Sequence, residues 1–422
     1  MGALGYLVAR SAWFAGVAPR GALDTASYLR VAHQPLWSLG FWAGERLWGL
    51  PLFYKVLPDS NTARTVGQLV VSLVAWAVLA AVVARRLPAP AWRIAGFVCV
   101  LLFSMSLSVI RWDRYVLSES LAISLTALLV AAWIEFVASP RMSVAAAIVV
   151  LSAPWAFTRD TNGPLLLVTA VAALVWAAWR GPHWRVVSIL GVALAAVVAL
   201  QFAAAGRSIR LPGNDRPMLH VIGRRVLDDP AQTRFFLAHG MPRPSARVLR
   251  GRSDLAGFAD DPTVDPATAR FFTWAARHGR STLAIYLVTH PVAATEATFD
   301  ARRMLFASVS TGYLPAGTTP ILQDATAEVI VALAVAGAAV WTVRAGGEGT
   351  VGRAWIVPIA LLVLQVPHAV LVYHGDTLEI PRHGIVMAIS ARLAILLLAL
   401  VGAAAGCDAV RRRRSRAAGA GS

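Results

Sequence analysis

The sequence predicts an all-α polytopic membrane protein, and three observations support this fold class. The chain of 422 residues is 57% hydrophobic and only 14% charged, whereas soluble proteins carry about 25% charged residues. Its mean hydropathy is +0.62. Apolar runs close to the roughly 20 residues that a helix needs to cross a bilayer recur along the chain.

Ten apolar runs are candidates for transmembrane helices, although the first and the fifth are short. They are predicted at about 3–18, 65–84, 93–110, 118–137, 143–157, 163–179, 186–205, 324–343, 354–373 and 384–405. With ten spans, all arginine-rich connections fall on one side of the membrane, which basic residues mark as cytoplasmic. We therefore expect a multi-pass protein of a bacterial cytoplasmic (inner) membrane, with both termini in the cytoplasm.

The predicted spans divide the chain into four parts. An N-terminal transmembrane module covers 1–205 and contains a Trp-rich, amphipathic outer loop at 19–64, suited to helices that lie in the membrane interface. The segment 206–323 is too polar to span and predicts a small helical subdomain on the outer face. C-terminal transmembrane helices at 324–410 and a basic cytoplasmic tail at 411–422 follow.

The charge and cysteine content narrow the range of partners. The formal net charge of +17 comes from arginines, since Lys55 is the only lysine, and the arginines flank apolar runs. This pattern indicates membrane lipid head groups or an anionic lipid-linked substrate, and no nucleic acid. Cys99 and Cys407 are the only cysteines and lie far apart, so neither a disulfide framework nor a cysteine metal site is expected.

Acidic residues that are suited to chemistry occur in four segments, all predicted to emerge on the outer side. Carboxylates near lipid are costly and tend to mark a functional site. The four segments carry Asp24, then Asp113 and Glu119, then Asp160, and finally Asp376 and Glu379. Their convergence on one face predicts a single active site that is covered by loops.

Asp24 directly follows the first predicted span. Its spacing from Tyr28 places both side chains on one face of a helix. A carboxylate in this position could accept a proton from an acceptor hydroxyl or orient that hydroxyl. The alternative interpretation is that Asp24 is the N-cap of an amphipathic helix.

The segment RWDRYVLSES places Arg111, Asp113 and Arg114 at the outer end of the third span and Glu119 at the start of the fourth. Two guanidinium groups suit a phosphate, because arginine binds phosphate oxygens in bidentate fashion. An internal brace between arginine and glutamate, together with helix capping, is the alternative.

Two further outer turns repeat this combination of charges. Arg159 and Asp160 follow the fifth span, where a capping turn is the alternative explanation. Glu379, Arg382 and His383 lie between the last two spans, and Arg382 is predicted to contact a lipid phosphate. A metal site is conceivable from the His, Asp and Glu residues here, but no spacing specifies one. A solvated outer loop is the alternative.

These features together resemble the GT-C superfamily of membrane glycosyltransferases, which use polyprenyl-phosphate sugars. In protein-mannosyltransferase-like members, an acidic residue in the first outer loop is followed by a tyrosine and later by a Pro-Leu-Tyr-like step, as in Asp24, Tyr28 and the sequence GLPLFY at 49–54. The segments WDRYVLSESLAISL, FTRDTNGPLLL and HGDTLEIPRHG also look like those of actinobacterial members.

The resemblance implies transfer of a sugar from a polyprenyl-phosphate donor to a cell-envelope glycan, lipid or protein at the outer face of the membrane. By resemblance, Asp24 is the catalytic base or acceptor-orienting carboxylate, and Asp113 and Asp160 have secondary catalytic roles. Residues predicted to bind substrate are Tyr28, Arg111, Arg114, Glu119, Arg159, Glu379, Arg382 and His383.

Two questions stay open at this stage. Many members of the superfamily carry paired acids in the first loop, where this chain has Asp24 alone, so a need for Mg²⁺ or Mn²⁺ is undecided. A lipid or small-molecule transporter or flippase is the alternative function. Such proteins often show internal repeats and charges at the membrane midplane, and neither is visible in this sequence.

Overall fold

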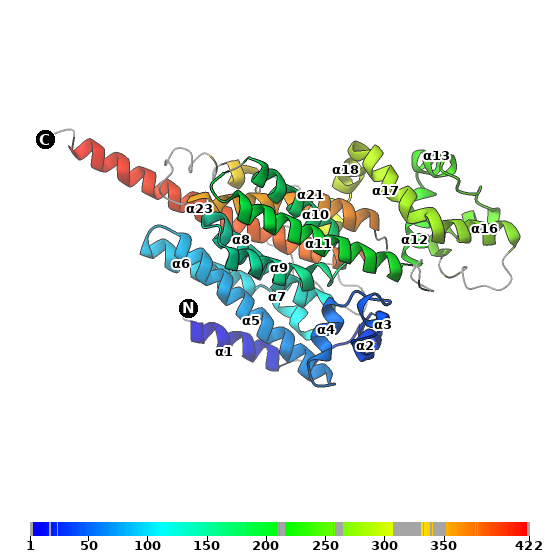
Figure 1. The fold of residues 1–422 in the computed structure, drawn as a ribbon, viewed down its shortest axis with the longest axis horizontal. Helices are drawn as coiled ribbons and strands as arrows, with labels where there is room; N and C mark the ends of the chain where they lie inside the picture. Colours follow the sequence, from blue (N-terminus) through cyan, green and yellow to red (C-terminus); the bar gives the residue numbers. More distant parts are fainter. Residues whose placement is uncertain are drawn as a thin grey trace.

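Helices form almost the whole of the described protein (Figure 1), and no β-strand occurs within the described residues. The computed structural model describes residues 3–16, 18–22, 24–179, 181–209, 211, 216–255, 257, 265–306, 331, 333–337, 340, 352–375, 377 and 379–419. The predicted all-α fold class is confirmed for this part of the chain.

Five of the described helices are long and apolar enough to cross a membrane. They are α5 (Asn61–Arg86), α8 (Ser118–Ala138), α11 (Trp184–Ser208), α21 (Ile356–Gly375) and α23 (Ile385–Gly419). A sixth span is formed if α6 (Pro90–Ser104) and α7 (Leu107–Ile110) are counted together, although they are bent by 52° at their junction. At the bend, Ser104 O accepts a hydrogen bond from Arg10 Nη1 at 3.0 Å.

The other predicted spans are matched only in part. The helices α1 (Ala3–Ala15), α9 (Met142–Ala156) and α10 (Asn162–Ala178) have 13, 15 and 17 residues, fewer than the roughly 20 that a perpendicular span requires. Most of the predicted span 324–343 lies outside the described residues. The prediction of ten transmembrane helices is therefore supported for five or six long helices and not for the full number.

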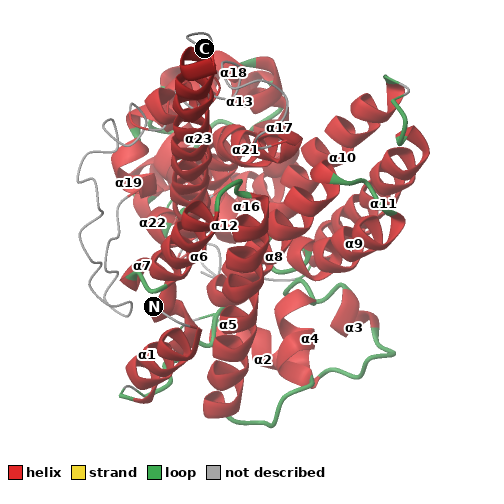
Figure 2. Cartoon of the chain, turned by 90° about the vertical axis from the view of Figure 1, so that its left-hand side faces the viewer, coloured by secondary structure: helices red, strands yellow, loops and turns green. Residues whose placement is uncertain are grey.

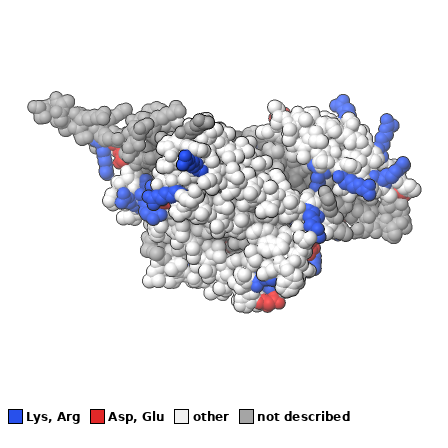
Figure 3. Space-filling model, in the orientation of Figure 1, with Lys and Arg blue, Asp and Glu red and all other residues white. Residues whose placement is uncertain are grey.

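The two ends of the bundle differ in composition. At one end lie the starts of α5, α8 and α23, together with α2 (Thr25–His33), α3 (Leu39–Trp42), α4 (Gly49–Lys55), η1 (Arg111–Arg114) and α22 (Ile380–His383). We call this the loop end. The opposite, tail end is where α5 ends and where α23 continues through the basic tail to Gly419. Basic side chains gather there (Figure 3).

The centre of the bundle is formed by α8 and α23, the two long helices that are buried to the largest extent. The sequence of α8 is apolar around its whole circumference, which is typical of a helix with protein on most sides. It packs against α5, α9 and α23, while α10 and α11 form a pair on one flank (Figure 2).

The segment that follows α11 forms a group of short helices with a core of its own. Phe236 and Phe271 lie at the centre of this core, with Met218, Leu219 and Ile222 around them. The helices are α12 (Arg216–Val221), η2 (Ile222–Val226), α13 (Pro230–Ala238), α14 (Ala246–Arg250), η3 (Arg252–Asp254), α16 (Pro266–Trp274), η4 (Ala275–Gly279), α17 (Arg280–Thr289), α18 (Pro291–Asp300) and α19 (Arg302–Phe306). This group, which we call the subdomain, lies at the loop end (Figure 1).

The subdomain packs on α21 through α12 and α18, and two of the contacts involve polar side chains. The guanidinium of Arg225 lies 3.5 Å from the centre of the Tyr373 ring. His374 Nε2 lies 3.1 Å from Ala294 O. The short helix η5 (Gly352–Trp355) precedes α21 at the tail end.

Candidate functional site

Charged side chains from parts of the chain that are distant in sequence meet at the loop end of the bundle. They come from the loop before α5, from the first turn of α8, from the segment after α9 and from α22. Together they form one connected set of ion pairs and hydrogen bonds, which we call the charge cluster: Asp24, Arg46, Glu119, Arg159, Glu379, Arg382 and His383.

Arg382 lies at the centre of the charge cluster because it contacts three carboxylates. Its Nε donates to Glu119 Oε1 at 2.8 Å, and its Nη1 lies 2.9 Å from Asp24 Oδ2 and 2.5 Å from Glu379 Oε2. Its side chain is only 2% exposed. A buried charge is costly unless it is paired, so these three partners explain how a guanidinium is held here.

Glu119 and Arg159 form the buried floor of the charge cluster. Glu119 is in the first turn of α8, where the positive end of the helix dipole favours a carboxylate. Its Oε1 lies 3.4 Å from Arg159 Nη1, and Arg159 Nη2 lies 3.1 Å from His383 Nδ1. Within the described part of the chain, Glu119 Oε2 has no hydrogen-bond partner. Arg159 thus connects the end of α9 with α22.

Asp24 occupies the N-cap position of α2, but its side chain does not cap that helix. Its Oδ1 instead accepts a hydrogen bond from Arg46 Nη2 at 2.5 Å, and its Oδ2 faces Arg382. Burial raises the pKa of the Asp24 carboxyl, but the two guanidinium groups outweigh burial, and the net pKa lies below the ordinary value of 3.8. Asp24 is therefore ionised at neutral pH.

Arg46 belongs to the charge cluster although the sequence analysis did not single it out. Its Nε donates to Ser27 Oγ at 2.7 Å, and its guanidinium lies 5.0 Å from the centre of the Tyr28 ring. A signal for it was present, because Glu45 and Arg46 are the only charged residues in the aromatic segment 37–54.

Tyr28 lies one turn after Asp24 and is buried against the start of α8. Its hydroxyl donates to Ser118 Oγ at 3.4 Å, and burial raises the pKa of its phenol group. A backbone bridge between Arg20 and Tyr115 holds the segment before α2 against the segment before α8. Local backbone pairing thus brings the first loop to Glu119.

A glycine allows α4 to approach the end of α9 closely. Gly49 N donates to Phe157 O at 3.0 Å. A Cβ at Gly49 would lie 2.6 Å from Phe157 C and 2.6 Å from Pro154 O, which is closer than real Cβ contacts. The Trp48 ring stacks on the Phe157 ring at 4.6 Å. This contact fixes the first loop beside Arg159.

The charge cluster combines a buried floor with a partly exposed rim. The floor residues Glu119, Arg159 and Arg382 have side chains that are 6% exposed or less. The rim side chains are between 21% and 37% exposed and belong to Asp24, Arg46, Glu379 and His383. A ligand can therefore reach the rim, while the floor holds the rim residues in place.

Asp113, a predicted catalytic residue, is not part of the charge cluster. Its Oδ2 lies 2.8 Å from Arg10 Nη2, and its Oδ1 accepts a hydrogen bond from Ser120 Oγ at 2.6 Å. Arg10 Nη2 also donates to Ser72 Oγ at 2.6 Å. Both charged side chains are almost fully buried, so the pair ties α1 to α5 and α8. The Asp113 carboxylate is thus buried and paired with Arg10, and a substrate cannot reach it in this conformation.

Arg111 and Arg114 also have their contacts outside the charge cluster. The guanidinium of Arg114 lies 3.7 Å from the centre of the Trp13 ring, and that of Arg111 lies 5.6 Å from the centre of the Trp112 ring. Asp160 is exposed beside Arg159, and its negative charge raises the pKa of Arg46 on the rim of the charge cluster. Asp376 lies outside the described residues.

The donor set of the charge cluster does not resemble a metal site. Asp24, Glu119 and Glu379 are each within 3 Å of a guanidinium nitrogen, and a divalent cation would have to displace these partners. Among the described residues, no group of three or more His, Cys, Asp or Glu residues is arranged to hold a metal ion.

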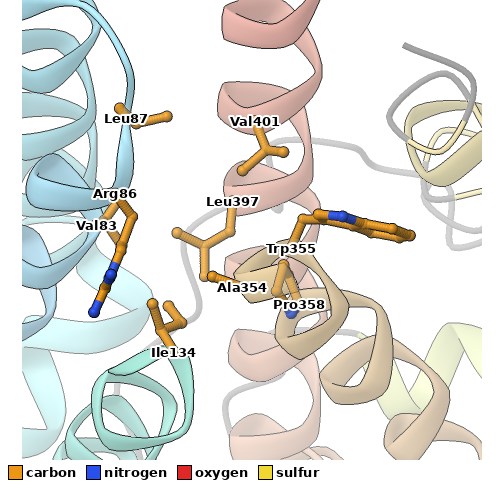
Figure 4. Close-up of a pocket in the computed structure, with 9 residues that line it drawn as sticks. All are labelled: Val83, Arg86, Leu87, Ile134, Ala354, Trp355, Pro358, Leu397 and Val401. Atoms are coloured by element: carbon orange, nitrogen blue, oxygen red, sulfur yellow. The ribbon is translucent and has the colours of Figure 1, made fainter. Parts of the chain in front are cut away.

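A pocket lies at the tail end, far from the charge cluster along α5 and α8 (Figure 4). Its lining is almost entirely apolar and comes from α5, α8, η5, α21 and α23. The lining includes Arg86, whose guanidinium is paired with Glu135. This pocket therefore offers an apolar surface and none of the carboxylates found at the loop end.

The long apolar helices and the buried charge cluster at one end of the bundle define the chain as a helical membrane protein. No protein-family model matches the chain, and no curated protein matches it either.

Proposed function

We propose that the protein is a membrane glycosyltransferase of the GT-C type, which moves a sugar from a polyprenyl-phosphate donor to a cell-envelope acceptor at the outer face of a bacterial cytoplasmic membrane. The observation that carries this proposal is the meeting of Asp24 with Glu119, Arg159 and Arg382 in one partly accessible cluster. The loop end then faces outward, and the basic tail end faces the cytoplasm.

The charges of the cluster suit this reaction. The acceptor oxygen attacks the anomeric carbon of the donor sugar, the bond from that carbon to the phosphate oxygen breaks, and the polyprenyl phosphate leaves with the electron pair. Asp24 is ionised and lies on the rim, so it can orient the acceptor hydroxyl and take its proton. Arg46, on the rim, can stabilise the negative charge on the departing phosphate, and Arg382 adds positive charge from the buried floor behind it.

Glu119 and Glu379 have a different role in this proposal. They hold Arg382 from two sides, so its guanidinium keeps one orientation as the phosphate arrives. A positioned cation stabilises developing charge without reorganisation during the reaction. His383 joins Arg159 to the same arrangement.

Transport of a lipid or small molecule is the second candidate function. The 52° bend between α6 and α7 favours it, as do the prolines inside α9 and α21, because interrupted helices are typical of transporters. The charges of the cluster lie at one end of the spans and not at their middle, which favours the enzyme.

A reconstitution experiment distinguishes the two functions. Purified protein in liposomes is supplied with radiolabelled polyprenyl-phosphate arabinose, mannose, glucose or galactose. The enzyme proposal predicts that one of these donors binds and that its sugar is transferred or slowly hydrolysed. Movement of intact donor between leaflets without release of sugar would instead identify a transporter. Failure to bind any donor would contradict the proposed donor class.

A further inference from the structure

The corner between α17 and α18 exposes apolar side chains that the subdomain core does not use. The helices are joined at His290, and around this joint Val288 is 79% exposed, Val292 is 68% exposed and Ile285 is 45% exposed. With the neighbouring exposed Pro291, we call these residues the corner patch. The opposite face of α17 buries other side chains, which pack in the subdomain core.

The corner patch lies in a stretch without formal charge. Between Arg280 and Glu296 the sequence contains no Asp, Glu, Lys or Arg. Figure 3 shows a largely white surface in the region of α17 and α18, bordered by a few charged side chains, whereas basic side chains gather over the more distant helices of the subdomain. A contiguous exposed apolar patch can mark a site of interaction with a protein or a membrane.

The polar groups at this corner form hydrogen bonds within the corner itself. Thr289 Oγ1 donates to Ile285 O at 2.8 Å, and Thr295 Oγ1 donates to Pro291 O at 2.7 Å. The His290 ring stacks on the Tyr286 ring, with centroids 4.7 Å apart. Hydroxyls that are satisfied by their own helix can enter an apolar medium at little cost.

The position of α18 indicates that the apolar surroundings of the corner patch are membrane lipid. α18 packs on the loop end of α21, one of the long apolar helices, through the contact between His374 and Ala294. Along the long axis of the molecule, α18 lies level with the loop ends of α21 and α11, while α13 and α16 extend further out (Figure 1). The corner between α17 and α18 therefore lies level with the end of the long apolar helices (Figure 1).

We propose that the corner patch inserts among the acyl chains of the membrane leaflet at the loop end and anchors the subdomain there. Removing Val288, Val292 and Ile285 from water is favourable, and no charged side chain of the corner has to enter the lipid. The anchor holds the subdomain at a fixed height beside the charge cluster. This inference concerns the membrane surface alone and does not depend on the proposed enzyme activity.

Spin labels at the patch test this proposal. Val288→Cys and Val292→Cys are each made in a Cys99→Ala, Cys407→Ala background, labelled with a nitroxide and reconstituted in vesicles of phosphatidylethanolamine and phosphatidylglycerol. Thr273→Cys, an exposed position on α16, is the matched control. Collision with oxygen, which concentrates in acyl chains, is compared with collision with a water-soluble nickel chelate.

Lipid insertion predicts an oxygen-to-nickel accessibility ratio several-fold higher at both patch positions than at Thr273. The vesicles contain no polyprenyl lipid, so this result assigns the patch to the bilayer itself. A ratio equal to that of the control would place the patch in water and overturn the proposal. Low accessibility to both reagents would show a protein contact and would also overturn it.

Discussion

At the residue scale, the loop end is held together by Arg382, a buried cation that has three carboxylate partners from three parts of the chain. The resulting ion pairs join α2, α8 and α22, and no single helix could hold this guanidinium alone. Removal of one member of a buried ion pair leaves the other charges uncompensated. The stability of the loop end should therefore respond strongly to this one side chain.

We expect Arg382→Met to destabilise the protein by about 3–5 kcal/mol, because Glu119 stays buried without its closest cation. Thermal unfolding in detergent measures the change. The control is Arg30→Met, which removes an exposed pair with Glu45 and should have little effect. Equal shifts for the two variants would show that the cluster is not a stabilising network.

The depressed pKa of Asp24 predicts a specific pH dependence. Because the folded-state pKa lies below 3.8, the stability from this carboxylate is fully present above pH 3.8 and is lost as the pH falls through the folded value. Unfolding midpoints measured from pH 7 to pH 3 should fall less steeply at the acid end for Asp24→Asn than for the natural chain. Identical acid profiles would contradict this assignment.

Much of the charge cluster could be predicted from the sequence, because charged residues are uncommon beside long apolar runs. Asp24, Glu119, Arg159 and Arg382 stood out because each is charged and lies beside a long apolar run. Arg46 was missed, although it and Glu45 are the only charged residues of an aromatic segment. The burial of Asp113 could not be predicted either, because its partner Arg10 lies 103 positions earlier in the chain.

At the element scale, the position of the first loop depends on the contact between α4 and the end of α9. Gly49 makes this contact possible because its Cα approaches the backbone of Phe157 without a Cβ between them. Trp48 then covers the same residue. A side chain at position 49 would push α4 away from Arg159.

We expect Gly49→Ala to destabilise the protein by about 1–3 kcal/mol, because the added methyl group overlaps fixed backbone atoms. The matched control is Gly206→Ala on α11, where a Cβ meets nothing within 4 Å. Unfolding midpoints of both variants in detergent provide the comparison. A Gly49→Ala variant as stable as the control would rule out the close packing described here.

Helix positions followed the apolar runs, but helix lengths and breaks did not. The long apolar runs were sufficient to predict the positions of α5, α8 and α11, because a helix that crosses a bilayer must be apolar along most of its length. The bend after Ser104 could not be read from hydropathy, and at this bend Ser104 O accepts a hydrogen bond from Arg10 on another helix. Tertiary contacts of this kind lie outside any local pattern.

At the scale of the whole molecule, charged side chains gather at the two ends of the bundle (Figure 3). The tail end carries the arginines of the short connections, and the loop end carries the charge cluster and the subdomain. The sequence predicted that the short arginine-rich connections share one end, because alternate connections return to the same side. It did not predict which helices are central, since hydropathy is similar for α8, α11 and α23.

The proposed orientation predicts which thiols can be reached from outside the cell. In a Cys99→Ala, Cys407→Ala background, Ser253→Cys in the subdomain should react with a membrane-impermeant maleimide in intact cells. Cys407, kept alone, is exposed at the tail end and should react only after the cells are permeabilised. The reverse pattern of labelling would invert the proposed topology.

Sugar transfer by the Asp24→Asn variant is the most direct test of the central claim that the charge cluster is an active site. The variant and a Glu296→Gln control are compared in liposomes with the donor that the natural protein uses. A positioned base contributes about 10²–10⁴-fold, so transfer should fall by that amount in Asp24→Asn while donor binding is kept and the control stays active. Transfer by Asp24→Asn at the rate of the control would contradict the claim.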